Sequence, residues 1–452
     1  MSANHGTLSC PATAALEHLK AQLGARLSTD PAELEPLRED RSGHRSPGAP
    51  LALIRAGSIE DVQLVCRTAS EHGIPVVTRG AGTGLAGGAS AGPGILNGAL
   101  NAQLAAHGLW WAPDPSSKDI STVGGNIAMN AGGLLCAKYG VTREAVLALT
   151  VVLADGRLIS VGHRTVKGVT GYDLCALMIG SEGTLGVIVE CTLALRPVVT
   201  GPRPVVAASF PSLIAASAAA SAVMAEGLTP ALLELMDGPT LECVEQLRGR
   251  RIGAPGSSFL LAQTDGAEAA EVAGRIAAIL ERAGGEVRAA EDEAEAEELV
   301  GLRRSAFPAL EARAEQMARD GGFDGRGSIL VEDIAVPRDR LAEAFERIRE
   351  IELSHGILIP TTTHAGDGNL HPIFLVGEPE VPERIWEAAD EVFRIALELG
   401  GTLSGEHGIG LLKRRWVGEE LGEDQLELQQ RIREVFDPQG ILNPGKVFAR
   451  EH

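Results

Sequence analysis

The order of apolar and polar residues divides the chain into two parts with different patterns. In the first part, apolar residues at helical spacing over residues 58–73 predict a helix, with Ser58 as its N-cap and Gly73 as its stop. The turn residues Asp155-Gly156 predict a hairpin within residues 145–161. Also expected here are a strand at 74–78, a helix at 96–107 and a strand ending the segment 180–195.

Beyond Arg196-Pro197 and Gly201-Pro202, which mark an expected domain boundary, helix and strand patterns alternate. The Ala/Glu-rich segment 289–298 is expected to be an exposed helix or lid without chemistry. Strands that alternate with helices favour a layered α+β architecture. Helices are expected at 212–226, 267–283 and 338–355, and strands at 231–236, 258–264 and 328–336.

Composition narrows the kind of partner that the chain can have. The 452 residues suffice for two or three domains, and the 44% that are apolar suffice for a sizeable core. Lys and Arg number 40 and Asp and Glu number 60, so the formal charge is −20. This charge argues against nucleic acid or an anionic membrane as the main partner, because both attract basic surfaces. An anionic substrate would need local positive charge from a metal or an Arg.

Cysteine usage and the N-terminus bear on location. The six cysteines form no CxxC pair, which favours buried free thiols in a reducing cytoplasm over disulfides or an iron–sulfur site. The N-terminus lacks the basic and apolar regions of a secretory signal, and no apolar run reaches the ~20 residues of a membrane helix. We therefore expect a soluble, cytoplasmic chain.

The segment 363–371, T-H-A-G-D-G-N-L-H, predicts a hairpin that brings two histidines together. With residues 366–369 as the turn, Ala365 pairs with Leu370 and His364 pairs with His371. Directly opposed residues share one face, with Cβ atoms about 5 Å apart, and two imidazoles at that spacing suit one divalent metal. A hydrogen-bonded surface pair without metal is the alternative.

A second segment, S-G-E-H-G at residues 404–408, completes a possible 2-His-1-carboxylate set. Glu406 would supply the oxygen ligand, and His407 is a spare imidazole beside it. The convergence of Glu406 on the histidine pair is an assumption at this stage, because the segments are distant in sequence.

Glycine-rich segments near the N-terminus predict a ligand site. The run R-G-A-G-T-G-L-A-G-G at 79–88 follows the expected strand but does not open a helix, so it is a weak Rossmann fingerprint. Its backbone N–H groups can still cradle a pyrophosphate, with charge from Arg79 and a hydroxyl from Thr83. A flexible surface loop is the alternative. A second Gly-rich stretch, residues 124–133, favours a long ligand with a flat part and a charged part.

With these motifs the chain resembles the FAD-linked 2-hydroxy-acid dehydrogenases, which include the glycolate oxidase D subunit, D-lactate dehydrogenases and D-2-hydroxyglutarate dehydrogenases. The resemblance extends over most of the chain. It rests on the segments 76–89, 113–117, 122–133, 180–188, 364–371 and 404–410 and on L-N-P-G-K at 442–446. It implies a vanillyl-alcohol-oxidase-like FAD domain over 1–202, a ferredoxin-like α+β substrate domain over 203–420, and a C-terminal segment, 421–452, that packs back on the FAD domain.

The resemblance also implies roles for single residues. His364, His371 and Glu406 would hold a divalent metal (Zn, Mn or Fe), His407 would be the base near the flavin, and Arg303 would bind the substrate carboxylate. A surface charge on a helix is the alternative for Arg303. Asn443 and Lys446 would contact flavin or substrate from the tail. The implied FAD contacts are Arg79, Gly80, Ala81, Gly82, Thr83, Gly84, Gly87, Pro113, Asp114, Ser116, Thr122, Gly124, Gly125, Asn126, Ala131, Gly132, Glu182, Gly183, Gly186, Val187, Ile188 and Asn443.

The implied reaction is oxidation of a small 2-hydroxy acid to the 2-oxo acid. The metal would lower the pKa of the hydroxyl, His407 would take its proton, and hydride would pass to flavin N5. No NAD fingerprint is evident, so a quinone, a flavoprotein or an iron–sulfur subunit is the expected electron acceptor. Such partners would make a hetero-oligomer, with the chain cytoplasmic or peripheral to the inner membrane.

The chain departs from the family pattern at two places. Only Ser90, Ala91 and Gly92 separate Ala89 from Pro93, where family members carry roughly thirty more residues, so FAD binding is in question. Around Phe307 and Val331 the chain lacks the polar residues that suit a second carboxylate, which favours a monocarboxylate such as D-lactate or glycolate.

Two other classes of function stay open from the sequence. A non-catalytic or degenerate paralogue is consistent with the shortened segment at residues 90–93. A metallohydrolase would use the His/His/Glu set without flavin, but it leaves the glycine-rich run at 79–88 without a role.

Overall fold

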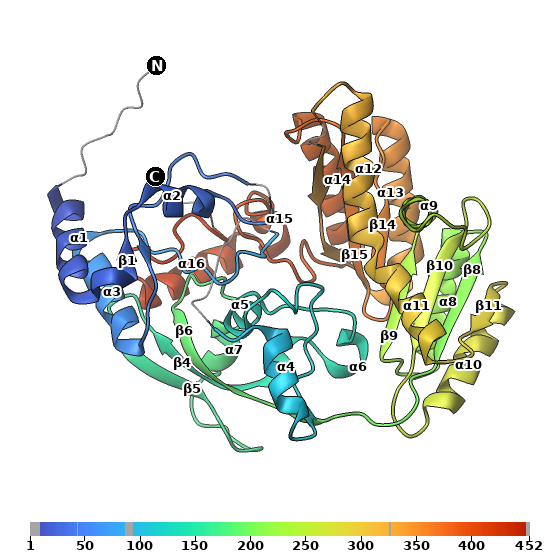
Figure 1. Cartoon of the computed structure of the whole chain (residues 1–452), viewed down its shortest axis with the longest axis horizontal. Helices are drawn as coiled ribbons and strands as arrows, with labels where there is room; N and C mark the ends of the chain where they lie inside the picture. Colours follow the sequence, from blue (N-terminus) through green and yellow to red (C-terminus); the bar gives the residue numbers. More distant parts are fainter. Residues whose placement is uncertain (1–9, 43, 86–93, 325–326, 449–452) are drawn as a thin grey trace.

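The computed structural model describes residues 10–42, 44–85, 94–324 and 327–448, which form two lobes (Figure 1). The N-terminal lobe holds short strands and helices, and the second lobe is built on one large sheet. The shortened segment at 90–93 and the predicted FAD contact Gly87 lie outside the described residues.

The N-terminal lobe contains a three-stranded antiparallel sheet in the order β5-β4-β6. Ser58 caps α3 by accepting a hydrogen bond from the Asp61 N–H, and Gly73 ends it at φ +64°, so this predicted helix is confirmed. The elements are α1 (Cys10–Leu23), β1 (Leu27–Ser28), α2 (Pro31–Leu34), β2 (Leu53–Ile54), α3 (Ile59–His72), α4 (Asn97–Ala105), β3 (Leu109–Trp110), α5 (Val123–Met129), α6 (Cys136–Tyr139), β4 (Val146–Val152), β5 (Leu158–Gly162), α7 (Leu174–Met178), β6 (Val187–Leu193) and β7 (Arg196–Pro197).

Two other predictions in this lobe have different outcomes. The hairpin at Asp155-Gly156 is confirmed, because β4 and β5 pair across it and Gly156 has φ +82°. The predicted strand at 74–78 is wrong. Only Val76 forms a bridge there, with Leu442, because no neighbouring strand offers this segment a longer ladder.

The second lobe is built on an eight-stranded sheet whose path runs β11-β8-β10-β9-β14-β15-β12, with β13 also paired to β15. The expected alternation of helices and strands is confirmed. The elements are β8 (Val205–Phe210), α8 (Leu213–Ala225), β9 (Leu232–Met236), α9 (Gly238–Arg248), β10 (Ser258–Gln263), α10 (Ala269–Arg282), β11 (Glu286–Ala289), α11 (Glu293–Arg304), α12 (Ala306–Asp320), β12 (Ser328–Val331), β13 (Ile334–Ala335), α13 (Leu341–His355), β14 (Thr361–His364), β15 (Asn369–Val376) and α14 (Glu383–Glu398).

Two further expectations for this lobe have different outcomes. The strand expected at 328–336 is two strands, because the buried acids Glu332 and Asp333 interrupt it. Of the two alternatives expected at 289–298, an exposed helix or a lid, the structure shows a mostly exposed segment that begins α11, and this helix extends to Arg304 and buries Leu299 and Leu302 against the sheet. The last turn of this helix therefore has access to the interior.

The period-2 alternation of the strands gives the large sheet two apolar faces. One face packs on α8, α10, α13 and α14, and the other packs on α9, α11 and α12. Leu232 and Met236 point to the second face, so Glu234 between them points there too. The second face thus carries polar side chains at the centre of an apolar layer.

The C-terminal segment returns to the N-terminal lobe through α15 (Val417–Leu421) and α16 (Glu423–Phe436) (Figure 1). The Asp437 carboxylate accepts hydrogen bonds from the Ile441 and Leu442 N–H groups at 3.1 and 2.7 Å. Leu442 is fully buried against Cys66, Val152 and Val187. The end of the described chain is therefore part of the core of the N-terminal lobe.

Five cysteines are free thiols, as expected: Cys66, Cys136, Cys175, Cys191 and Cys243. Burial holds for Cys66, Cys175 and Cys243, but Cys191 is exposed on β6, so the expectation of uniformly buried thiols is wrong. Within the described ranges, no helix has the length and hydropathy needed to cross a bilayer.

Candidate active site

The two histidines of the predicted hairpin lie on one face of the sheet, but not in the predicted register. His364 is opposite Asn369 and His371 is opposite Thr362, so the two histidines are diagonal neighbours, and the predicted direct pairing is wrong. The turn consists of residues 365–368, and the N–H groups of Asp367 and Gly368 donate to the His364 carbonyl. The reason is β13, which pairs Ala335 with Asn369 and draws Asn369 into the sheet. The ring centroids of the two histidines are still 5.1 Å apart.

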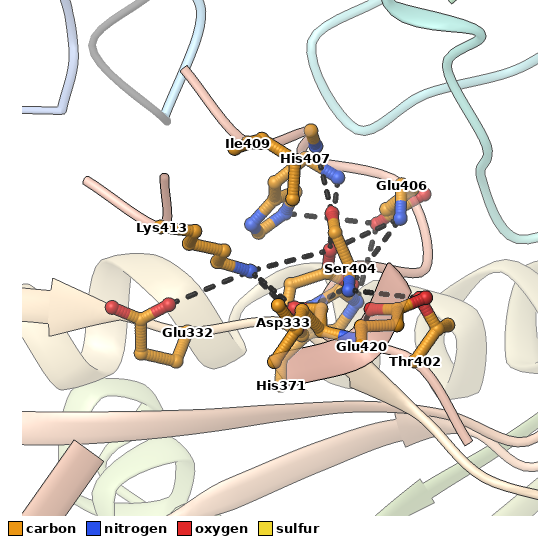
Figure 2. A network of polar contacts seen from close by, with 12 residues as sticks. Glu332, Asp333, His371, Thr402, Ser404, Glu406, His407, Ile409, Lys413 and Glu420 are labelled. Atoms are coloured by element: carbon orange, nitrogen blue, oxygen red, sulfur yellow. Dashed lines mark hydrogen bonds and ion pairs between the residues drawn. The ribbon is translucent and has the colours of Figure 1, made fainter. Parts of the chain in front are cut away.

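The loop that carries Glu406 and His407 is held by a single buried carboxylate, Asp333 (Figure 2). Its Oδ2 accepts hydrogen bonds from the Ser404 hydroxyl at 2.7 Å and from the N–H groups of Glu406 and His407 at 3.0 Å each. The Ser404 Oγ in turn accepts from the Gly408 N–H at 2.8 Å. A carboxylate in such a cradle fixes the backbone direction of two consecutive site residues.

Lys413 also supports the loop that carries Glu406 and His407. Its fully buried ammonium donates to the carbonyl of Asp333 at 2.7 Å and to that of Leu403 at 3.0 Å. It also lies 3.5 Å from a carboxylate oxygen of Glu332. Burial raises the pKa of Glu332 to about 7, against the lowering influence of Lys413. The contacts of Lys413 hold the segment that joins β12 and β13 against the loop at 404–407.

Glu406 converges on the histidine pair, as the sequence could only assume. Its Oε1 lies 3.5 Å from His364 Nε2 and 3.2 Å from His371 Nε2. One ligand atom from each of these three residues lies within 4.8 Å of the others. Burial alone would raise the pKa of Glu406, but His364 and His371 hold it well below its usual range. A carboxylate that stays charged beside two imidazole nitrogens is a donor set suited to a divalent cation such as zinc.

His407 lies directly beside this set. Its ring stacks on that of His371 with centroids 5.0 Å apart, and its Nε2 is 3.8 Å from Glu406 Oε1. Burial lowers the pKa of His407 to about 4, which the Asp333 carboxylate only partly offsets. The imidazole is therefore uncharged at neutral pH and has a lone pair that can accept a proton.

On the other side of the histidine pair, a second buried carboxylate contacts both a predicted metal ligand and the predicted carboxylate-binding residue. Glu234 Oε1 is 2.8 Å from His364 Nδ1, and its Oε2 is 2.9 Å from Arg303 Nε. Arg303 comes from the last turn of α11. Burial would lower the pKa of His364, but Glu234 first and Glu406 next raise it well above its usual value.

These side chains open onto a cavity of about 440 Å³ between the two lobes. His364, His371, Glu406, His407 and Arg303 all line it. The predicted FAD contacts on its wall are Ala81, Gly82, Thr83, Gly84, Asp114, Ser116, Thr122, Gly125, Asn126, Ala131 and Gly132. The structure thus brings both glycine-rich segments and both histidine motifs to one space.

Features of the wall fit a polar ligand. The Asn126 amide nitrogen and the Ser121 hydroxyl are buried without a hydrogen-bond partner among the described atoms, and both residues line the cavity. A Cβ on Gly132 would lie 2.5 Å from Glu406 Oε2, and one on Gly133 would lie 2.5 Å from the Asp114 carbonyl. The glycines therefore let this wall of the cavity approach the candidate metal ligands closely. The unpaired polar atoms of Asn126 and Ser121 are available to a cofactor.

Other predicted FAD contacts are not on the described cavity wall. These are Arg79, Gly80, Pro113, Gly124, Glu182, Gly183, Gly186, Val187, Ile188 and Asn443. Arg79 donates to the Glu39 carbonyl at 2.9 Å, and a Cβ on Gly186 would lie 2.4 Å from Val151, so these two have packing tasks. Their contact with a cofactor stays a prediction.

Glu182 and Asn443 link three distant segments next to the site. The buried Glu182 carboxylate accepts from the Ile409 and Gly410 N–H groups at 2.7 and 2.8 Å. The Asn443 side-chain amide donates to the Glu182 carbonyl at 2.5 Å. Burial lowers the pKa of the nearby Lys446. These residues position the loop that follows His407, and their contact with substrate or flavin stays a prediction.

Several residues around the cavity escaped the sequence analysis. Glu234 and Asp333 are acids within apolar strand segments, a signal that could have found them, because an unpaired charge is rarely buried. Lys413 had no such signal. Arg41 lines the cavity with its guanidinium carbon 5.0 Å from the Phe307 ring centroid, and its backbone N–H donates to the Gly82 carbonyl at 3.2 Å. Arg41 therefore connects the two lobes at the cavity.

Comparison with known proteins bears directly on this cavity. Residues 201–447 match the family model described as "FAD linked oxidases, C-terminal domain", and residues 50–92 and 87–162 match "FAD binding domain". The chain is 36% identical over 436 residues to the glycolate oxidase subunit GlcD of Bacillus subtilis, covering 89% of this chain and 90% of that protein. It is also 36% identical over 430 residues to the D-lactate dehydrogenase of Archaeoglobus fulgidus, covering 88% and 91%.

Solved structures share the fold at low identity. The chain superposes on p-cresol methylhydroxylase with a TM-score of 0.77 and 16% identity, covering 99% of each chain. It superposes on alkyldihydroxyacetonephosphate synthase with a TM-score of 0.72 and 18% identity, covering 98% of this chain and 87% of the other. At such identities the likeness is one of fold alone.

Proposed function

The chain belongs to the FAD-linked oxidases, and from that premise we propose that it oxidises a small 2-hydroxy acid to the 2-oxo acid. It is an oxidoreductase by family, and the substrate class is the proposal. One observation carries it: His364, His371, Glu406, His407 and Arg303 face a cavity that the glycine-rich segments also line. The reaction requires binding of the acid, removal of a proton and acceptance of a hydride. The residues around the cavity can serve each of these requirements.

The residues divide these tasks according to their chemistry. Arg303 binds the substrate carboxylate, since a guanidinium matches a carboxylate through two parallel hydrogen bonds. His364, His371 and Glu406 hold a divalent cation (Zn, Mn or Fe), which would supply Lewis-acid polarisation of the hydroxyl. Bound FAD would supply the hydride acceptor. His407 takes the hydroxyl proton, and its uncharged state at neutral pH, due first to burial, supports that assignment.

The apolar part of the cavity wall supports a small monocarboxylate such as D-lactate or glycolate. Phe307, Val331 and Ile373 line the cavity together with Arg303. The Arg41 guanidinium is already engaged by the Phe307 ring and so is less free for a second carboxylate. This assignment agrees with the names of two relatives, a glycolate oxidase subunit and a D-lactate dehydrogenase.

We also propose the division predicted from the sequence: a FAD domain over 1–202, a substrate domain over 203–420 and a returning segment over 421–452. In support, the large sheet begins at β8, and Val76 is bridged to Leu442. The FAD contacts proposed are those named from the sequence, with the residues on the cavity wall best supported.

For the electron acceptor we propose a quinone, a flavoprotein or an iron–sulfur subunit. The relative from Bacillus subtilis is named as a subunit, which supports a hetero-oligomer. A cytoplasmic place, peripheral to the inner membrane through partners, remains a prediction. The metallohydrolase alternative loses its basis with membership of the FAD-linked oxidases.

A degenerate, non-catalytic paralogue is the second candidate. The FAD binding domain matches in two pieces, 50–92 and 87–162, which meet at the shortened segment. A loss of residues there would weaken FAD binding while leaving the candidate metal ligands in place.

A visible spectrum separates the two candidates. Purified protein reconstituted with FAD should show flavin absorption that bleaches anaerobically on addition of D-lactate or glycolate. Protein that stays colourless after reconstitution, yet binds metal, would contradict the proposed oxidation and favour the degenerate paralogue.

A further inference from the structure

Glu234 lies between His364 and Arg303, two residues to which the proposed function gives roles. The proposed function gives Glu234 itself no role. This residue is the central residue of β9 and is directly opposite His364 across the strand pair. Its side chain is 1% exposed. A buried carboxylate is costly unless charged or polar partners compensate it, so its partners define its place in the site.

The contact with His364 selects which ring nitrogen faces the other predicted ligands. A carboxylate can only accept, so Nδ1 of His364, at 2.8 Å from Glu234 Oε1, carries the hydrogen. Nε2, which lies 3.5 Å from Glu406 Oε1, is then the nitrogen that can give up its proton and bind a cation. Without Glu234 the ring could present either nitrogen or rotate.

The contact with Arg303 has a similar consequence on the other side. Glu234 Oε2 lies 2.9 Å from Nε, the nitrogen nearest the side-chain stem. The two terminal nitrogens of the guanidinium are left for the cavity, which Arg303 lines. Among the described residues Glu234 is the ion-pair partner of Arg303, so its charge holds the guanidinium at this place, although the N–H of Nε is not aligned as a hydrogen-bond donor to it.

We propose that Glu234 is a positioning residue that sets, through its two oxygens, the metal-binding nitrogen of His364 and the place of the Arg303 guanidinium. The proposal rests on the proposed function for the roles of those two residues. A purely structural role, in which Glu234 only neutralises a buried Arg, would affect stability and leave the affinity for metal unchanged.

Metal affinity without flavin or substrate separates these roles. The full chain, stripped with a chelator, is titrated with Zn²⁺ alone, and wild type is compared with Glu234→Gln. The isosteric amide loses the charge that orients the imidazole, so we expect binding about 10- to 100-fold weaker. Glu234→Gln with wild-type affinity for Zn²⁺ would overturn the proposal.

Glu245→Gln is the matched control. Glu245 is a buried carboxylate of α9 that accepts from the Ile252 and Gly253 N–H groups at 2.7 and 3.0 Å, and it is not on the cavity wall. Its variant should bind Zn²⁺ as wild type does. Equal weakening in both variants would mean a general effect of losing a buried carboxylate, which also overturns the positioning role.

A measurement on the wild type covers the case in which Glu234→Gln does not fold. Nitrogen NMR of the zinc-loaded protein should show His364 with hydrogen on Nδ1 and metal on Nε2, and the reverse arrangement would overturn the proposal. Wild type that binds no Zn²⁺ is a distinct result: it removes the proposed metal site itself, and the inference about His364 with it.

Discussion

Single residues decide whether the candidate metal site can form, because His364 and His371 are buried and Glu406 is only partly exposed, so each has little room to move. His364 and His371 are nearly inaccessible, and Glu406 is enclosed by them and by the backbone of Gly132. The sequence indicated the two histidines from their types and spacing, and it added Glu406 on the assumption that its segment converges on them. Glu234 and Asp333 stand out in the sequence only as acids within apolar segments, and their tasks could not be read from it, because they depend on contacts between strands that are distant in the chain.

Gly132→Ala is expected to displace Glu406. The new Cβ would lie 2.5 Å from Glu406 Oε2 and 3.1 Å from its Cβ, so the carboxylate must move. We expect at least about a tenfold loss of Zn²⁺ affinity, comparable with the loss of an orienting group. The control is Gly274→Ala in α10, where a Cβ meets nothing within 4 Å and should stabilise the helix by about 0.5–1 kcal/mol. Unchanged metal binding in Gly132→Ala would contradict the geometry described for Glu406.

At the scale of elements, the hairpin shows what local sequence can and cannot specify. Turn residues predicted a hairpin correctly, but the register depended on β13, which pairs with the far side of β15. A two-residue shift in pairing kept both histidines on the same face, since side chains alternate with period two. The helix α3 was predictable to within a residue because its cap and stop are local, whereas the split between β12 and β13 depends on two buried acids.

Asp237 links two elements and should make stability depend on pH. It caps α9 through the Thr240 N–H and accepts from the Thr361 N–H of β14. Burial raises its pKa to about 7, so the folded state holds a proton that the unfolded state releases near pH 4. The contribution of this carboxyl to the free energy of unfolding is fully present below about pH 4 and is lost as pH rises through about 7.

Asp237→Asn should therefore flatten the pH dependence. Between pH 5 and pH 8, the free energy of unfolding of wild type should fall by about 1–4 kcal/mol more than that of the variant. Denaturant titrations at both pH values measure this. Asp292→Asn, at the exposed N-cap of α11, serves as the control because its carboxyl is in solvent, and it should keep the wild-type slope. Equal slopes in wild type and Asp237→Asn would exclude this account of Asp237.

At the scale of the whole molecule, the family and the α+β fold predicted from the sequence motifs are confirmed by the family match and by the structural neighbours. The placing of the cavity between lobes was not accessible from sequence, because it depends on how Arg41 and the glycine-rich segments meet α11 and the hairpin. The return of the C-terminal segment was implied by resemblance, and its anchor is visible in the bridge between Val76 and Leu442.

Leu442→Ala tests that anchor. The side chain is fully buried with Cys66, Val152 and Val187, so its loss should cost about 2–5 kcal/mol of unfolding free energy. Leu428→Ala, on the exposed side of α16, should change stability by no more than about 0.5 kcal/mol. Denaturant unfolding of both variants gives the comparison, and similar small effects would mean that the tail is not part of the core.

The central claim is that three side chains from two distant segments hold one cation beside a bound flavin, where a 2-hydroxy acid is oxidised. Its most direct test is anaerobic reduction of the FAD-loaded protein by D-lactate or glycolate, before metal removal, after it, and after Zn²⁺, Mn²⁺ or Fe²⁺ is restored. The account predicts bleaching of the flavin that is lost with the metal and regained with it. It also predicts that His371→Ala binds FAD but does not bleach. Bleaching that is indifferent to the metal and to His371 would contradict it.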